Sequence, residues 1–140
     1  MSTQMVVFKL NEEHFAVEVA SVESIIKLQT ITKIPHAPNF VVGVTNLRGN
    51  IVPVIDLESR LGLKTAAPGM DTRIVVALIK DQKIGMVVDA VSQVIEIENN
   101  QIEPTPKLST SVDSIFIKGI VMKDNDLIIL LDLEKIFGDN

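Results

Sequence analysis

The chain contains no cysteine, which excludes disulfides, thiolate nucleophiles, iron–sulfur clusters and cysteine-based zinc sites. Tryptophan and tyrosine are also absent, and aromatic residues make up 4% of the chain. Because the formal net charge is −5 as well, a surface that stacks bases or grips phosphates is disfavoured, and we expect no nucleic-acid partner. No apolar run approaches the ~18 residues of a membrane span, and Met1–Gln4 lacks the basic start of a secretion signal. We therefore expect a cytoplasmic protein without direct membrane insertion.

Residues suited to catalysis are equally scarce. The two histidines, His14 and His36, have no partner at metal-ligand spacing. Gly43 and Gly49 stand among apolar residues and do not form a phosphate-binding loop. Acidic residues are plentiful, but they occupy expected turns and helix caps, and no spacing favours a pair for acid–base chemistry. We expect no enzymatic activity, no cofactor and no metal.

The chain is an ordinary globular sequence that contains two related halves. Its 140 residues are 46% hydrophobic and 22% charged, which is typical of a single domain. Residues 6–22 align without a gap on residues 75–91, at an offset of 69 (75 − 6). Residues 40–62 align on residues 116–138, at an offset of 76 (116 − 40). The identities in the second block are Phe40, Gly43, Asp56, Leu57, Glu58 and Gly62, which recur as Phe116, Gly119, Asp132, Leu133, Glu134 and Gly138. We predict an internal duplication within one domain spanning 1–140, with halves at about 6–62 and 75–138.

Each half has the pattern of five short strands followed by a short helix. Phe15–Val19 shows the alternation of a half-buried strand. Asp56 and Asp132 stand where a helix N-cap belongs, and Gly62 and Gly138 where a C-cap belongs. The predicted fold class is therefore mainly β. We expect two SH3-like five-stranded β-barrels packed side by side, with short helices that include one at the C-terminus.

Two of the expected strands are apolar on both faces. Ile74–Ile79 and Leu127–Leu131 contain almost no polar residue, although a lone small barrel leaves one face of each strand in water. The simplest cover for the outer face is the other barrel. This pattern is also compatible with an exchange in which a terminal strand of one half completes the other barrel.

The halves diverge most at the turn between their fourth and fifth strands. Residues Met122–Asp126 form an ordinary polar turn, whereas Thr45–Asn50 place Arg48 at the tip of a glycine turn. Pro53 follows inside a run that otherwise looks like a central strand. Because proline donates no ladder hydrogen bond, we predict an edge or a bulge there. Arg48 either docks a protein partner or pairs with a surface acid, and the residues alone leave both alternatives open.

The string from Gly43 to Leu57 resembles the signature of the CheW family, the coupling proteins of bacterial chemotaxis. It contains Asn-Leu-Arg-Gly-x-Ile-Val-Pro-x-Ile-Asp-Leu, which is long and specific. The resemblance covers nearly the whole chain: Phe8–Ile25 is similar to the family's first hairpin, Gly85–Asp89 to its second characteristic stretch, and Ile129–Ile136 to its C-terminal part. It implies two SH3-like barrels side by side and an adaptor without catalysis.

The resemblance also implies partners. A member of this family links the regulatory domain of the histidine kinase CheA to the cytoplasmic tip of methyl-accepting chemoreceptors, whose helix lies in a groove between the barrels. We expect a monomer alone and arrays with the partners. The implied receptor-facing residues are Val22, Ile25, Gly43, Asn46, Arg48, Gly85 and Val94. The implied kinase-facing residues are Ile51 and Val52 on a barrel edge, and Glu103 and Leu108 in a loop.

The sequence departs from the family's pattern at one implied contact. Many members carry Glu two residues after the position of Val22, whereas this chain has Ser24 there and its acid one step earlier, at Glu23. The charge partner of Arg48 is therefore open, with Glu23 as a candidate. Leu108 also stands where the family has an aromatic residue, which implies a smaller contact.

Three other functions remain open at this stage. The first is a coupling protein of a non-motility chemosensory pathway, which the sequence does not distinguish from chemotaxis. The second is a small β-barrel enzyme, which requires a polar cleft with a perturbed acid or base. The third is a nucleic-acid-binding SH3-like barrel, against which the net charge of −5 argues.

Overall fold

The computed structural model describes residues 1–104 and 112–137. Leu108, one of the implied kinase-facing residues, and the C-cap position Gly138 lie outside them. The strands are β1 (Ser2–Leu10), β2 (Glu13–Glu18), β3 (Val22–Lys27), β4 (Val41–Leu47), β5 (Asn50–Asp56), β6 (Arg73–Ile79), β7 (Gln82–Val88), β8 (Ala90–Glu98), β9 (Ile117–Lys123) and β10 (Asp126–Leu131). The α-helices are α1 (Leu57–Arg60) and α2 (Leu133–Phe137). No helix in this part of the chain is long and apolar enough to cross a membrane.

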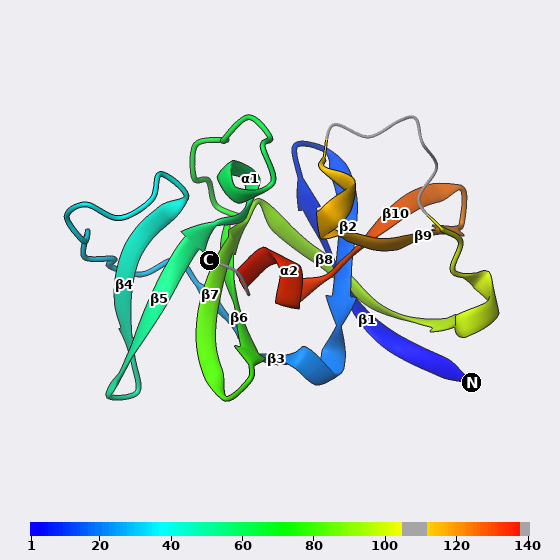
Figure 1. Cartoon of the computed structure of the whole chain (residues 1–140), viewed down its shortest axis with the longest axis horizontal. Coiled ribbons are helices and arrows are strands. Elements are labelled where there is room, and N and C mark those ends of the chain that lie inside the picture. The colour runs from blue at the N-terminus through cyan, green and yellow to red at the C-terminus, as the bar shows by residue number, and fades with distance from the viewer. Residues whose placement is uncertain (105–111, 138–140) are drawn as a thin grey trace.

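The strands form two five-stranded sheets that lie side by side (Figure 1). Sheet A has the order β8-β1-β2-β10-β9 and sheet B the order β3-β6-β7-β5-β4. The mainly β fold with short helices confirms the predicted fold class. Each sheet takes its hairpin β1–β2 or β6–β7 from one half of the chain and its other three strands from the other half. The exchange therefore involves a whole hairpin, and not the single terminal strand that the sequence suggested.

Neither sheet closes into a barrel through a ladder between its edge strands. In sheet B, the chain that leaves β3 crosses to the far edge and forms one bridge there, with Thr32 and Val44 exchanging two hydrogen bonds of 2.8 Å. In sheet A, Glu103 and Ile120 form the matching bridge with two bonds of 2.9 Å. A short bridge therefore stands where a closed barrel would have a full ladder. The two bridges occupy corresponding places in the two sheets.

The core has three parts, which explains why some strands are apolar on both faces. Met5 and Val7 of β1 belong to a small cluster within sheet A, and Ile74 and Val76 of β6 to one within sheet B. The residues that alternate with these along each strand, Val6 on β1 and Val75 on β6, belong to a larger cluster that both sheets share. The main members of this shared cluster are Val6, Phe8, Leu10, Phe15, Val17, Ile55, Leu57, Val75, Ala77, Met86, Val88, Ile129, Leu131 and Ile136. One face of these strands therefore packs within its own sheet and the other face joins the two sheets.

Four hairpins share one kind of tight turn. Each has a two-residue loop in which both residues have positive φ, the geometry of the type I′ turn that matches the twist of paired strands. The four loops are Asn11-Glu12, Arg48-Gly49, Lys80-Asp81 and Asp124-Asn125. These turns fix the register of every hairpin and place Arg48 at the tip of β4–β5.

Arg60 connects the two halves at the joint between the sheets. Its guanidinium carbon lies 4.8 Å from the ring centre of Phe40 and 4.9 Å from that of Phe116, which are aligned positions of the two halves. Its Nε also donates a hydrogen bond of 2.8 Å to the carbonyl oxygen of Ile136 in α2. A guanidinium can stack on an aromatic ring while it donates in its own plane, so one side chain holds both helix regions together.

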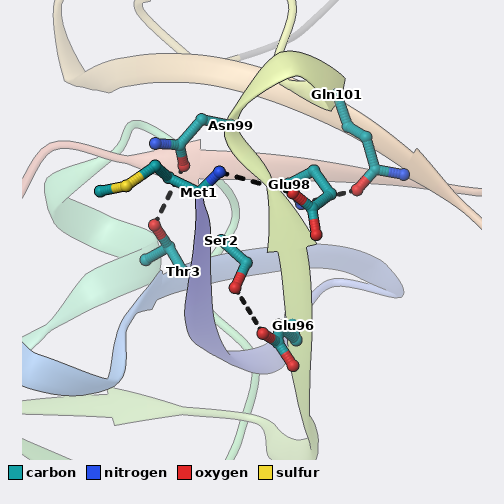
Figure 2. A network of polar contacts seen from close by, with 7 residues as sticks. All are labelled: Met1, Ser2, Thr3, Glu96, Glu98, Asn99 and Gln101. Carbon is teal, nitrogen blue, oxygen red and sulfur yellow. Dashed lines mark hydrogen bonds and ion pairs between the residues drawn. The ribbon is translucent and has the colours of Figure 1, made fainter.

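Polar contacts tie the start of β1 to the end of β8 (Figure 2). The Ser2 hydroxyl donates to the Glu96 carboxylate, and the Thr3 hydroxyl donates to Asn99 Oδ1 at 3.1 Å. The amino group of Met1 lies 3.8 Å from the Glu98 carboxylate. Edge strand β8 is thereby held to β1 through its last residues, beyond what the backbone ladder alone provides.

Candidate docking surfaces

A hollow of about 310 Å³ lies at the joint between the sheets. Its lining comes from β1, β3, β6, β8 and the residues just before β6, and consists of Lys9, Ile25, Asp71, Arg73, Ala90, Val91 and Ser92. Ile25 on β3 is 40% exposed, and Val94 lies further along β8 with 56% exposure. Val22 is half-buried and packs against the shared core. Three of the seven implied receptor-facing residues therefore lie on β3 and β8, and Ile25 borders the hollow itself.

Two of the implied receptor-facing residues are buried glycines. A Cβ on Gly43 would lie 2.0 Å from the carbonyl oxygen of Thr32, the residue that bridges to β4. A Cβ on Gly85 would lie 2.8 Å from a methyl group of Ile74. Both positions need the small residue because another chain segment packs directly on the backbone. A substitution there therefore acts first on the fold, and neither glycine offers a side chain to a partner.

The tip of the β4–β5 hairpin presents Arg48 to solvent. Arg48 is exposed, and no carboxylate among the described residues forms an ion pair with it. Asn46 lies beside it, and its Oδ1 accepts a hydrogen bond of 3.0 Å from the Gly49 amide. Asn46 therefore shapes the turn, while the charge of Arg48 is left for solvent or a partner.

The candidate partner for Arg48 is engaged elsewhere. Glu23 forms an ion pair of 3.2 Å with Lys83 of β7. At the neighbouring position, the Ser24 hydroxyl oxygen is buried and has no hydrogen-bond partner within residues 1–104 and 112–137. The sequence left open whether Arg48 docks a partner or pairs with a surface acid. Pairing with a surface acid requires an ion pair of Arg48, and none of the ion pairs among the described residues involves Arg48.

Sheet B opens between β5 and β7, next to the implied kinase-facing residues. The two strands are parallel and pair only from Val54 with Gly85 onward. Before that point they border a hollow of about 410 Å³ lined by Asn50, Ile51, Val52, Pro53, Asp81, Gln82 and Lys83. Ile51 is 67% exposed there. Val52 is 1% exposed and its side chain belongs to the core of sheet B, so the inclusion of Val52 in a contact surface does not fit its burial.

Pro53 accounts for the opening. Val44 uses both its N–H and its carbonyl to bond Thr32, on the side of β4 that faces away from β5. Its cross-strand partner Pro53 therefore directs its own backbone groups away from β4 and toward β7. In sheet A the corresponding strands β10 and β2 pair two residues earlier, from Ile128 with His14. The position that aligns with Pro53 is Ile129, which has an N–H to donate. The predicted edge or bulge is therefore a loss of pairing on one side of a central strand.

The remaining implied kinase-facing residue, Glu103, is exposed and forms the bridge to Ile120 of β9. Two exposed apolar side chains on the same sheet as Glu103 were not predicted from the sequence. Met122 and Leu127 are cross-strand partners on β9 and β10, with exposures of 58% and 46%. Their aligned positions in the other half are Asn46 and Ile51. The alignment of the halves was a signal that could have found Leu127, since both Leu127 and Ile51 are aliphatic.

The described residues hold no group of three or more histidine, aspartate or glutamate side chains placed to bind a metal. Asp56 and Asp132 act as predicted at the helix starts: Asp56 accepts from the Ser59 amide at 3.4 Å and Asp132 from the Lys135 amide at 3.3 Å. The surfaces of interest are two hollows with mixed polar and apolar linings, exposed aliphatic side chains beside them, and an exposed arginine, a combination that suits contact with another protein.

Comparison with known proteins identifies chains of the same kind. A family model described as CheW-like domain matches residues 4–140. The probable chemotaxis protein CheW of Rhizobium etli is 36% identical over 97% of this chain and 88% of its own. The chemotaxis protein CheW of Thermotoga maritima is 38% identical over 94% of this chain and 85% of its own.

A solved structure shows the same arrangement of strands. The crystal structure of the scaffolding protein TtCheW from Thermoanaerobacter tengcongensis superposes with a TM-score of 0.91 at 42% identity. The match covers 100% of this chain and 90% of that one. The similarity extends over both sheets, so the whole chain corresponds to these proteins.

Proposed function

The chain belongs to the CheW family, non-catalytic adaptors that couple chemoreceptors to the kinase CheA in chemotaxis, and from this premise we propose how it divides the two partners between its surfaces. The cytoplasmic tip of a receptor docks at the hollow between the sheets. The regulatory domain of the kinase docks at the opening between β5 and β7 and near Glu103. The protein acts in the cytoplasm, as a monomer alone and within arrays when its partners are present.

The receptor surface rests on exposed aliphatic side chains beside a hollow. Ile25 and Val94 are 40% and 56% exposed on β3 and β8, and the hollow adds the charged rim of Lys9, Asp71 and Arg73. An amphipathic helix that docks in a groove needs an apolar floor for its anchors and a polar rim for its flanks. This pairing of features is the observation that carries the proposal.

The kinase surface rests on the opening that Pro53 leaves in sheet B. Ile51 is the most exposed large aliphatic side chain on β5, and it stands at the mouth of a hollow of about 410 Å³. An apolar anchor from a partner that fills such a pocket contributes strongly to affinity. Glu103 supports a second kinase contact at the outer edge of sheet A.

Arg48 is a second, charged receptor contact in this proposal, at the tip of the β4–β5 hairpin and outside the lining of the hollow between the sheets. Arg48 is exposed at a tight two-residue turn and forms no ion pair within the described residues. Exposed charges of this kind steer association and fix orientation, and arginine is often dominant at interface centres.

The test is a matrix of two variants against two partners. Ile25→Glu is expected to weaken binding of a receptor-tip fragment by about 30-fold or more and to leave the kinase regulatory domain unaffected, with Ile51→Glu showing the reverse. Asn39→Glu, which adds the same charge at an exposed loop position outside both hollows, is the matched control and leaves both affinities near wild type. If both variants weaken both partners equally while melting normally, the division of surfaces is wrong.

A further inference from the structure

A buried carboxyl group lies under the segment that connects the two halves, residues 61–72. Glu58 of α1 is 2% exposed, although glutamate is rarely buried without a partner. Its Oε1 accepts a hydrogen bond of 2.9 Å from the amide of Ala66 in the connecting segment. Its Oε2 is also buried and receives no hydrogen bond from any donor among the described residues. A bare carboxylate oxygen in this position is costly, so a proton there is favoured.

The group that faces Glu58 is a second carboxyl, that of Asp89 between β7 and β8. A proton on Glu58 Oε2 would supply the missing partner, because a protonated carboxyl donates a hydrogen bond to a second carboxylate. Burial is the largest cause that raises the pKa of Glu58 to about 7, followed by this hydrogen bond and by the charges of Asp89 and Asp56, while the Ala66 amide lowers it. The charged side chains that face Glu58 are thus both acidic, and no cation among the described residues forms an ion pair with it.

The carboxyl pair joins three parts of the molecule. Asp89 accepts a hydrogen bond of 2.9 Å from the backbone amide of Asn11, in the β1–β2 turn of sheet A. The Asn11 side chain in turn donates to the carbonyl of Lys64 in the connecting segment, also at 2.9 Å. The network therefore runs from the β1–β2 turn through Asp89, which follows β7, and Glu58 of α1 to the connecting segment, and the Asn11 side chain closes it at Lys64.

Leu61 and Thr72 are buried at the two ends of the connecting segment, whereas residues 64–71 between them are exposed. A cavity of about 250 Å³ lies beneath this segment, lined by its residues Ala66, Pro68 and Thr72 and by Asp56, Glu58 and Asp89 below, among others. A gap of this size deprives the segment of contacts with the core, so the polar network supplies much of its attachment. The aligned carboxylate of the other half, Glu134, is exposed, and α2 has no connecting segment over it among the described residues.

We propose that Glu58 and Asp89 share one proton and that this proton keeps the connecting segment attached to the joint between the sheets. When the proton leaves, two negative charges face each other in a buried site with Asp56 nearby, and the segment is released so that water reaches them. This attachment through Glu58 and Asp89 does not depend on which partners the surfaces bind, so its test is separate from that of the proposed function.

The sign of the pH dependence follows from the two states of Glu58. In the closed state its pKa is about 7, and in the open, hydrated state it returns to about 4.5. Between pH 4.5 and pH 7 the closed state holds a proton that the open state has lost. The equilibrium constant for opening therefore rises with pH in this range and becomes constant above the closed-state pKa. The equilibrium constant for opening is expected to rise about tenfold between pH 6 and pH 8.

Hydrogen exchange of the Ala66 amide measures this opening on the full chain. After correction for the intrinsic pH dependence of exchange, the protection factor of wild type should fall about tenfold between pH 6 and pH 8. Glu58→Gln keeps an acceptor for Ala66 and a donor for Asp89 without a titrating group, so its protection should stay constant. Glu134→Gln is the matched control and should keep the wild-type fall.

Carbon NMR of the side-chain carboxyls provides a second measurement that needs no variant to fold. The Glu58 resonance of the wild-type protein is expected to titrate with a midpoint near pH 7. A midpoint near the ordinary glutamate value of 4.5 overturns the proposal. Protection of Ala66 that is independent of pH in wild type, or a fall that persists in Glu58→Gln, overturns it as well.

Discussion

Arg60 and Arg48 place the same chemical group in opposite settings. Arg60 is partly buried, lies between the rings of Phe40 and Phe116 and donates to a backbone carbonyl. Arg48 is exposed at a turn and has no ion pair among the described residues. Stability should therefore depend on the first and partner binding on the second, which two substitutions can separate.

Arg60→Ala is expected to destabilise the protein by about 2–3 kcal/mol, because it removes two cation–π contacts and a charged hydrogen bond. For a domain of this size the melting temperature should fall by roughly 10 °C. Arg60→Lys should restore little of the lost stability. An ammonium group lacks the flat face and the in-plane N–H donors that let a guanidinium stack on a ring and donate a hydrogen bond at the same time. A melting curve of Arg60→Ala that overlays wild type would show that the two rings are held together without the guanidinium.

Arg48→Ala is expected to leave the free energy of unfolding within about ±0.5 kcal/mol of wild type, as exposed substitutions usually do. Binding of a receptor-tip fragment should weaken by about 30-fold, the equivalent of about 2 kcal/mol. Arg48→Lys should recover only part of the affinity if the contact is bidentate. The measurements are a melting curve and a binding titration of each variant. Unchanged affinity for the receptor fragment would remove Arg48 from the docking surface.

At the level of elements, strand β5 differs from its counterpart β10 through one residue. β10 pairs with β2 from Ile128 onward, whereas β5 pairs with β7 only after Pro53. The opening at Ile51 is therefore a consequence of a missing backbone donor and not of a different sheet architecture. The same proline supplies the kinase-side hollow in the proposed function.

Pro53→Val is expected to extend the parallel pairing of β5 and β7 by one step, so that the new residue pairs with Ile84 as its counterpart does in sheet A. The amide that the substitution creates faces β7, so it should be protected from hydrogen exchange by more than about 100-fold. Stability should not fall, while kinase-domain binding should weaken because the hollow narrows. Amide exchange measured by NMR decides the matter: a new amide that exchanges like an exposed one contradicts this account of the opening.

The sequence was enough to predict the elements, because their signals are local. Strand alternation, turn residues and the aspartates before α1 and α2 all correspond to observed features, for example the Asp56 cap. The exchange of hairpins could not be predicted, since aligned strands from either half bury the same kinds of side chain. The contacts of Arg60 were also out of reach, because they join residues from three distant segments whose side chains give no periodic signal.

The candidate surfaces could be predicted in part for the same reason. The exposed position of Arg48 followed from a glycine turn, which is a local pattern. The burial of Val52 and the role of Gly43 depend on which segment lies across the strand, and the sequence carries no direct mark of that. The pair of Glu58 and Asp89 likewise forms only when the connecting segment covers it.

For the whole molecule, the exchanged hairpins mean that neither half completes a sheet by itself. Each sheet needs two strands from one half and three from the other, and the shared core takes side chains from both. A chain cut in the connecting segment should therefore give two fragments that cannot bury their apolar faces alone.

Fragments 1–67 and 68–140, made separately, are expected to lack stable tertiary structure and to form a folded 1:1 complex when mixed. Circular dichroism and amide NMR spectra of the mixture should approach those of the intact chain. The connecting segment is exposed over most of its length, so the cut itself removes few contacts. A dispersed NMR spectrum from either fragment alone would contradict the dependence of each sheet on both halves.

An adaptor must hold both partners at the same time, so the two proposed docking surfaces must be occupied together without competition. In the proposed function the receptor tip docks on β3 and β8, and the kinase regulatory domain docks mainly at the opening between β5 and β7. Titration of the kinase regulatory domain into the chain, with and without a saturating receptor-tip fragment, tests this claim most directly. With two separate surfaces, the kinase affinity should change by less than about threefold and a 1:1:1 complex should form. A kinase affinity that falls in proportion to the receptor fragment added would mean that the partners compete for one surface and would contradict the proposed pair of surfaces.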